Sequence, residues 1–172
     1  MNLYLVGYRG SGKTTVAQLV ADEIGLPWID ADAALEQRAG KTIREIFAES
    51  GEETFRGLES AELAILAGGP DRVVALGGGA VLREQNRQLI QDSGRTAWLR
   101  ARAETLLTRI ETDATTAQRR PNLTSAGGLA EIEQLLAVRT PIYAECADYV
   151  VDVDDLSPAD VAAAIVAWWR TL

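Results

Sequence analysis

The feature that most constrains the fold lies near the N-terminus, where a glycine-rich loop separates two apolar runs. Gly7, Gly12, Lys13 and Thr14 fit the spacing G-x-x-x-x-G-K-[ST] without a mismatch. The apolar run before the loop, residues 3–6, is as short as a buried strand, and the apolar residues after the loop recur at helical spacing. A strand that enters a helix through such a loop predicts a parallel α/β fold.

The same loop predicts a binding site for a nucleoside triphosphate. Its glycines allow backbone N–H groups to converge on phosphate oxygens, and the N-terminus of the following helix adds partial positive charge. Lys13 can reach the β- and γ-phosphates, and the hydroxyl of Thr14 can ligate Mg²⁺. A chance match in a glycine-rich turn is the alternative, and the strand–loop–helix context argues against it. The residues expected around the phosphates are Gly10, Ser11, Gly12, Lys13, Thr14 and Thr15.

Composition limits the class of protein and its partners. The chain has 172 residues and a formal net charge of −8, so we expect one domain over residues 1–172 and no nucleic-acid partner. No apolar run approaches the length of a membrane span, and the first run lacks the basic flank of a signal peptide. With no histidine in the chain, any general base must be a carboxylate or something weaker. The single cysteine, Cys146, excludes an internal disulfide and suits the reducing cytoplasm. We also expect a monomer without a membrane partner.

Strand and helix patterns alternate along the chain, which predicts a parallel sheet covered by helices. Thr42 and Glu45 have the spacing of a capping box before a short helix that Gly51 ends, and Thr140 with Pro141 predicts a new helix start. Strands are expected at about 2–6, 26–29, 73–76, 96–99 and 149–151. Helices are expected at about 13–24, from 33, at 43–49, 52–67, 84–93, 103–111 and 129–139, from 141, and from 158.

Two aspartates follow the second expected strand. Ligands bind beyond the carboxyl ends of strands in open α/β sheets, so Asp30 and Asp32 are candidate ligands. Asp30 is the candidate partner of Mg²⁺ through water, because the third strand ends without the usual acidic residue. Asp32 is the candidate for contact with the substrate. Equally, one of the two could simply cap the helix that follows.

Two further segments carry patterns with more than one interpretation. Arg56 and Glu59 are three residues apart and share a helix face, where the pattern alone favours an exposed ion pair of little energetic value. Gly77, Gly78 and Gly79 directly follow the third strand. Three glycines permit a ligand to approach the backbone closely, although a plain turn would also use glycine.

The segment from about 112 to 126 is polar and has neither helical nor strand period. Such a segment is a candidate lid over a binding site. It contains Arg119 and Arg120, and Arg120 is the better candidate for the site because Pro121 fixes the chain just after it. A solvated loop whose arginines have no role is the alternative.

Taken together, these residues resemble a shikimate kinase over nearly the whole chain. The resemblance implies one domain like the nucleoside monophosphate kinases, an α/β three-layer sandwich built on a P-loop. In it, a five-stranded parallel sheet of order 2-3-1-4-5 has helices on both faces, a substrate-binding insertion at about 32–60 and a lid. It also implies transfer of the γ-phosphoryl of ATP to the 3-hydroxyl of shikimate, in chorismate and aromatic amino acid biosynthesis. The signatures are the phosphate loop, Asp30-x-Asp32, Phe55-Arg56 with Glu59, Gly77-Gly78-Gly79-Ala80, Arg120-Pro121, and Arg139 followed by Pro141 and Tyr143.

The resemblance implies a role for each matching residue. Lys13 and the loop amides would cradle the phosphates of ATP, and Thr14 with Asp30 would hold Mg²⁺. Asp32 would bind the shikimate hydroxyls and accept the proton. The resemblance further places Arg56 and Arg139 on the shikimate carboxylate, Glu59 against Arg56, Gly78 and Gly79 on shikimate through their backbone, Arg120 on the phosphates, and Arg109 beside the adenine.

Two other functions stay open. A gluconate kinase would also act on an anionic polyol, and only the resemblance, through Arg56, Arg139 and the three glycines, favours shikimate. A nucleotide-binding regulatory protein without catalysis is the second, although every residue type that catalysis needs is present. The chain departs from the family at Asp152-Val153-Asp154-Asp155, which is acidic where many relatives carry a basic residue near the adenine.

Overall fold

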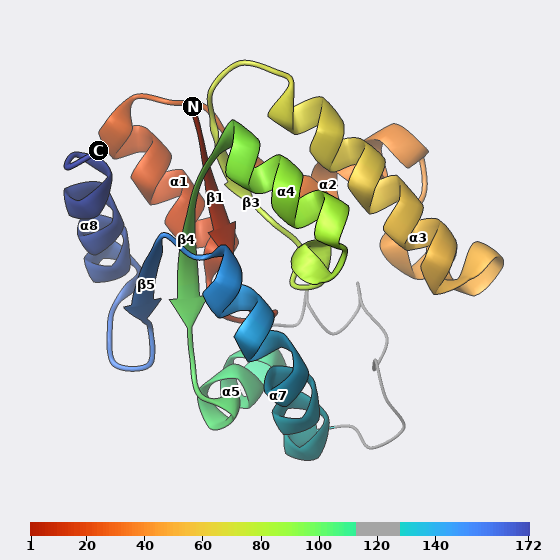
Figure 1. Ribbon diagram of the computed structural model, residues 1–172. Coiled ribbons are helices and arrows are strands. Elements are labelled where there is room, and N and C mark those ends of the chain that lie inside the picture. The colour runs from red at the N-terminus through yellow and green to blue at the C-terminus, as the bar shows by residue number, and fades with distance from the viewer. Residues whose placement is uncertain (113–127) are drawn as a thin grey trace.

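The computed structural model describes residues 1–112 and 128–172, and Figure 1 shows their arrangement. Five strands form one sheet in the order β2-β3-β1-β4-β5, and every neighbouring pair is parallel. This confirms the expected order. β1 and β3 are buried along their whole length, as continuous apolar runs in a central parallel sheet should be. The strands are β1 (Asn2–Val6), β2 (Trp28–Asp30), β3 (Val73–Ala75), β4 (Gly94–Arg100) and β5 (Tyr149–Asp152).

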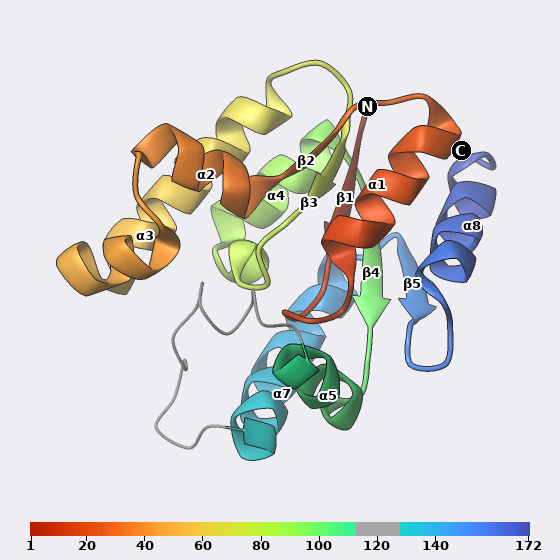
Figure 2. The same cartoon turned by 180° about the vertical axis from the view of Figure 1, so that it is seen from behind.

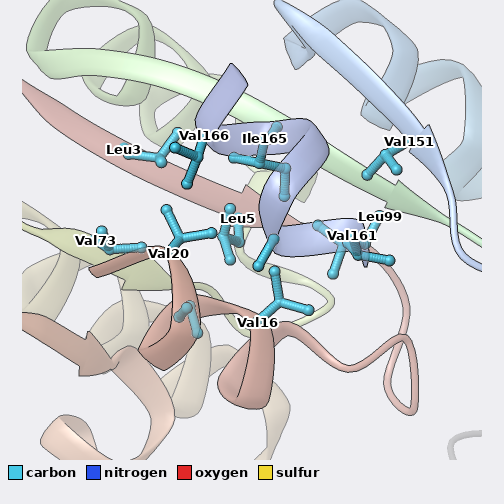
Figure 3. Packing of buried hydrophobic residues seen from close by; sticks show 14 of the residues in the cluster. Leu3, Leu5, Val16, Val20, Val73, Leu99, Val151, Val161, Ile165 and Val166 are labelled. Atoms are coloured by element: carbon cyan, nitrogen blue, oxygen red, sulfur yellow. The ribbon is translucent and has the colours of Figure 1, made fainter. Parts of the chain in front are cut away.

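Helices cover both faces of the sheet (Figures 1 and 2). α1 and α8 pack on one face, where Val16 and Val20 of α1 and Ile165 of α8 lie against Leu5 (Figure 3). α3, α4 and α7 pack on the other. The sandwich therefore has the three layers expected. The helices are α1 (Lys13–Ile24), α2 (Ala31–Ala39), α3 (Ile43–Ala67), the 3₁₀ turn η1 (Ala80–Leu82), α4 (Glu84–Ser93), α5 (Ala103–Thr112), α7 (Gly128–Cys146) and α8 (Pro158–Trp169).

The expected new helix start at Thr140 and Pro141 is wrong, because α7 runs unbroken through both residues. A proline inside a helix removes one hydrogen bond and costs about 3 kcal/mol. Here Tyr143 and Cys146, beyond the proline, are buried in the core under the sheet. Their burial stabilises the last turn of α7 in the helical conformation and outweighs the tendency of the proline to end or begin a helix.

α2 and the first part of α3 stand beside the sheet and share a small apolar cluster of their own, which includes Leu35 and Phe55. The expected capping box at Thr42 and Glu45 is confirmed at the start of α3. α3 then continues through residue 51, where the expected boundary appears as a kink: Gly51 has φ 78° and ψ 175°, values that no helix residue adopts.

Because the strands are parallel, their carboxyl ends meet at one edge of the sheet. β1 leads there into the phosphate loop, β2 ends at Asp30, and β3 leads into Gly77-Gly78-Gly79. Most of the expected lid, including Arg119 and Arg120, lies outside the described residues. In the described ranges, no helix has the length and apolar character needed to cross a membrane.

Candidate active site

The phosphate loop closes tightly over the end of the sheet. A side chain on Gly7 would meet the carbonyl oxygen of Leu99 at 2.6 Å, so only glycine fits there. Gly12 caps α1 with φ 92°, a left-handed conformation that also favours glycine. The Lys13 ammonium donates to the carbonyl oxygens of Gly7 and Tyr8, at 2.9 and 2.8 Å, and therefore lies over the loop. The loop holds a fixed cation beside the N-terminus of a helix, which suits an anion.

Asp30 caps the helix that follows it, which is one of the two roles that its sequence position left open, and its other oxygen contacts the phosphate loop. Its Oδ1 accepts from the backbone N–H groups of Asp32 and Ala33, at 3.0 and 3.1 Å, and so caps α2. Its Oδ2 accepts from the Thr14 hydroxyl at 2.7 Å. The cap fixes the carboxylate, so that its second oxygen faces the start of α1. α2 begins at Ala31, two residues earlier than expected, because Asp30 is the capping residue.

A cleft of about 270 Å³ opens at this edge of the sheet. Asp32 and Glu36 line it from α2, one turn apart, and Arg109 lines it from α5. Arg109 also donates to the carbonyl oxygen of Val153 at 2.7 Å, which ties α5 to the segment after β5. The remaining lining residues are Arg9, Gly10, Gly12, Lys13, Thr14, Thr15, Asp30, Ile43, Leu76, Gly77 and Gly78.

The three glycines after β3 form the meeting point of the site. A side chain on Gly77 would lie 2.6 Å from Oδ1 of Asp32 and 3.1 Å from Oε1 of Glu59. A side chain on Gly79 would overlap the guanidinium of Arg56, at 2.6 Å from Nη2. Polar side chains from α2 and α3 thus cross directly over glycine backbone, which requires glycine at Gly77 and Gly79, and the close approach of a ligand stays a prediction.

Arg56 and Glu59 are buried, so the pattern-based preference for an exposed ion pair is wrong. Both side chains are about nine-tenths buried, and Nη1 of Arg56 donates to Oε2 of Glu59 at 2.8 Å. Nη2 of Arg56 donates to Glu52 at 3.2 Å. Burial raises the pKa of Glu59, and the neighbouring Arg56 opposes that rise. Spacing identified the shared face correctly, but it could not show that this face meets the glycine segment.

α7 brings a second arginine to the same place. Arg139 is buried, and its Nη1 donates to the carbonyl oxygen of Gly78 at 3.4 Å. The Tyr143 hydroxyl, one turn further along α7, donates to the same oxygen at 2.5 Å. The Arg139 guanidinium also lies 5.6 Å from the centre of the Tyr8 ring, which belongs to the phosphate loop. Arg56 and Arg139 therefore flank the glycine segment from two different helices.

Comparison with known proteins decides the family. The family model described as shikimate kinase matches residues 9–170. The chain belongs to the shikimate kinase family. It is 46% identical to the shikimate kinase of Rhodopirellula baltica, over 88% of this chain and 81% of that one. It is 42% identical to the shikimate kinase of Symbiobacterium thermophilum, over 96% and 94%. Among solved structures, the shikimate kinase from Acinetobacter baumannii in complex with shikimate matches with a TM-score of 0.92 at 33% identity, covering 99% of this chain and 93% of that one.

Membership of the shikimate kinase family makes the chain an ATP-dependent kinase that phosphorylates shikimate. In the acidic stretch at residues 152–155, two of the three aspartates are paired. Arg100 donates to Asp152 through two nitrogens, at 2.5 and 2.7 Å, and this bond lowers the pKa of Asp152. Asp154 accepts from the backbone N–H of Arg102 at 2.9 Å. Arg100 and Arg102 therefore offset the charge of two of the carboxylates in this stretch.

Glu36 and Arg9 line the cleft, although the sequence did not single them out. Glu36 lines the cleft and accepts from the backbone N–H of Ile43 at 2.9 Å, which joins α2 to the start of α3. Arg9 lies inside the phosphate loop and also lines the cleft. A helical spacing of four from Asp32 could have pointed to Glu36. Arg9 occupies a variable position of the loop motif, which gives no signal by itself.

Proposed function

We propose that the γ-phosphoryl group of ATP is transferred to the 3-hydroxyl of shikimate within this cleft, by the residues that meet at the three glycines. One observation carries the proposal: the glycine segment touches both halves of the site. A side chain on Gly78 would lie 3.3 Å from the carbonyl oxygen of Gly7 in the phosphate loop and 3.7 Å from Nη1 of Arg139 on α7. A phosphate donor on the loop and an anionic acceptor between the arginines would therefore be neighbours.

The phosphate end consists of the loop and the start of α1. The backbone amides of residues 10–15 and the Lys13 ammonium would hold the β- and γ-phosphates. The Thr14 hydroxyl and the Asp30 carboxylate offer two oxygen ligands 2.7 Å apart, which fits Mg²⁺, a cation that prefers oxygen and keeps several waters. Within the described residues, no group of three or more acidic, histidine or cysteine side chains could hold a metal alone, which also suits an ion shared with phosphates. When bound, Mg²⁺ would neutralise charge on the phosphates.

The acceptor end consists of side chains from α2, α3 and α7. Two guanidinium groups can grip a planar carboxylate, so Arg56 and Arg139 would hold that of shikimate. Glu59 would keep Arg56 in place, as its hydrogen bond already does. The Asp32 carboxylate would accept from the hydroxyls of the ring. The backbone of Gly78 and Gly79 would complete the wall, because glycine has no side chain of its own to keep a ligand away.

The chemical step requires little from a base. The 3-hydroxyl oxygen of shikimate forms a bond to the γ-phosphorus, the bond from that phosphorus to the β–γ bridging oxygen breaks, and ADP leaves with the electron pair. The hydroxyl proton passes to the Asp32 carboxylate. The transition state is loose, so positioning and charge neutralisation contribute more than basicity. A site without histidine suits this chemistry.

Three assignments complete the proposal. Arg109, held on the Val153 carbonyl at the far end of the cleft, would lie beside the adenine. Arg120, as the lid arginine, stays a prediction from the sequence, since it lies outside the described residues. The enzyme would act as a cytoplasmic monomer without nucleic-acid or membrane partners, which the net charge of −8 supports for nucleic acid.

Replacing the two arginines tests the assignment of the acceptor end. Arg56→Ala and Arg139→Ala should each weaken shikimate binding by about 1.5–3 kcal/mol, the range for hydrogen bonds to charged groups. ATP affinity should stay near that of the wild type, as measured by calorimetric titration of each ligand. Arg95→Ala serves as the control, because Arg95 pairs with Asp148 at the opposite end of the sheet and its loss changes the net charge equally. Equal losses for ATP and shikimate would place these arginines elsewhere.

A further inference from the structure

The phosphate loop carries an arginine for which the proposed mechanism has no use. Arg9 stands between Gly7 and Gly12 and lines the cleft, and only 13% of its side chain is exposed. Its Nη2 donates to Oε1 of Glu131 at 3.1 Å. A long charged side chain on a loop usually extends into water. The burial of the Arg9 side chain against a buried carboxylate therefore calls for an explanation.

Glu131 is itself an unusual residue at its position. It lies in the first turn of α7, where a carboxylate is favoured by the helix dipole, yet its side chain is only 1% exposed. Its neighbours in the chain and in the loop include Ile132 and Tyr8, which belong to the small apolar cluster that packs α5 and α7 under the loop. An ion pair that is this deeply buried is often no more stabilising than apolar residues of the same volume. Packing alone therefore gives no reason for a charged pair here.

The position of Arg9 suggests the reason. Its backbone nitrogen lies 3.4 Å from where a side chain on Gly78 would begin, so Arg9 stands where the loop meets the glycine segment. Its guanidinium lies 6.0 Å from the centre of the Tyr8 ring, and Arg139 lies 5.6 Å from the same centre. Arg9 is thus at the boundary between the phosphate end and the acceptor end of the cleft, which the transferred phosphoryl group must cross.

We propose that Arg9 supplies a further positive charge to the phosphoryl group at this boundary, and that Glu131 is the positioning residue that holds the Arg9 guanidinium there. The proposal rests on the function proposed above. Charge in the transition state spreads over the three equatorial oxygens of the phosphoryl group, so more than one cation can stabilise it. An arginine has five N–H donors, and the bond to Glu131 uses one of them. Its Nε is buried without a hydrogen-bond partner among the described residues. The guanidinium therefore still has N–H donors available for a phosphoryl oxygen.

The test compares loss of the charge with loss of the packing. Arg9→Met removes the charge and the hydrogen bond that Arg9 donates to the buried Glu131, so this variant should lose both stability and kcat. The double variant Arg9→Met with Glu131→Leu replaces the ion pair by an apolar pair. It should regain the melting temperature of the wild type, because replacing a buried ion pair by apolar residues is often neutral or stabilising. Its kcat should stay about 10- to 100-fold below that of the wild type. The KM for shikimate should change less than about twofold, because the charge acts on the transferred group.

Two single variants and a control complete the experiment. Arg9→Lys keeps a charge without the planar fork, and Glu131→Gln keeps an acceptor without the charge, so both should give an intermediate kcat at a near-normal KM for shikimate. Arg95→Met removes an equal charge from an ion pair with Asp148 at the opposite end of the sheet and should keep kcat within about twofold.

The outcomes separate this proposal from the one on which it rests. A double variant with wild-type kcat would mean that the pair is structural and would overturn the proposal. A large rise in the KM for shikimate at unchanged kcat would overturn it too, by placing Arg9 on the acceptor. Wild-type enzyme that releases no ADP with shikimate would instead refute the proposed function, since that result involves no variant.

Discussion

The sharpest structural prediction concerns a single methyl group on Gly79. The backbone there has φ −107° and ψ 0°, which any residue can adopt, so alanine introduces no backbone strain. The new carbon would, however, lie 2.6 Å from Nη2 of Arg56 and 2.8 Å from its Cζ. Carbon contacts are comfortable at about 3.5 Å, so the guanidinium would have to move by about 1 Å. Glu59 and Glu52 hold it from the other side, so the movement breaks at least one charged hydrogen bond.

The expected effect follows from that displacement. A charged hydrogen bond contributes about 1.5–3 kcal/mol, so Gly79→Ala should weaken shikimate binding by roughly 10- to 150-fold. The KM for ATP should change little, because Gly79 does not line the part of the cleft next to the loop. Steady-state kinetics with each substrate varied in turn would measure both values.

A double variant makes the reasoning refutable. If the methyl group acts only by displacing Arg56, then Gly79→Ala added to Arg56→Ala should cost nothing more, and the two effects should not add. Gly57→Ala is the matched control. It follows Arg56 in the chain, and its new carbon would meet no described atom within 4 Å beyond its chain neighbours and the backbone of its own helix. It should stabilise α3 by up to about 1 kcal/mol. Additive losses, or a Gly79→Ala enzyme with normal shikimate KM, would refute the contact between Gly79 and Arg56.

Two further predictions concern charge. Lys13→Ala removes a cation used most in the transition state and should lower kcat by roughly 10²-fold or more without unfolding the protein, so a folded and nearly fully active variant would contradict its role. Burial raises the pKa of Glu59 above its ordinary 4.5, so the folded protein binds this proton more tightly and loses stability as pH rises from about 4.5 through the folded pKa. Glu59→Gln cannot titrate, so the free energy of unfolding of the wild type relative to this variant should fall over that window in urea titrations. A flat or rising difference would show that Arg56 outweighs the burial.

The sequence was sufficient for the fold because its strongest signals are local. The glycine-rich loop, the apolar runs and the capping box at Thr42 each act within a few residues, and the strand order followed from the resemblance. The errors came from tertiary contacts. Pro141 stays inside α7 because residues beyond it are buried, which a local rule about proline cannot anticipate.

The site was predictable in its parts rather than in its arrangement. Asp30 and Asp32 were located from their place after a strand, but the sequence could not show which of the two caps the following helix, and the contacts show that Asp30 does. Spacing alone made Arg56 an exposed residue, since burial depends on what the glycine segment brings against it. Arg9 and Glu131 lie 122 residues apart, and neither position carries a pattern that links it to the other.

The central claim is the transfer of a phosphoryl group from ATP to shikimate. We would incubate the enzyme with ATP and Mg²⁺, add shikimate or gluconate as alternative anionic polyols, and follow ADP release together with the phosphorus NMR spectrum of the product. The account predicts ADP release with shikimate, matched mole for mole by one new phosphate monoester on the 3-hydroxyl. Release of ADP with gluconate, and none above background with shikimate, would contradict it.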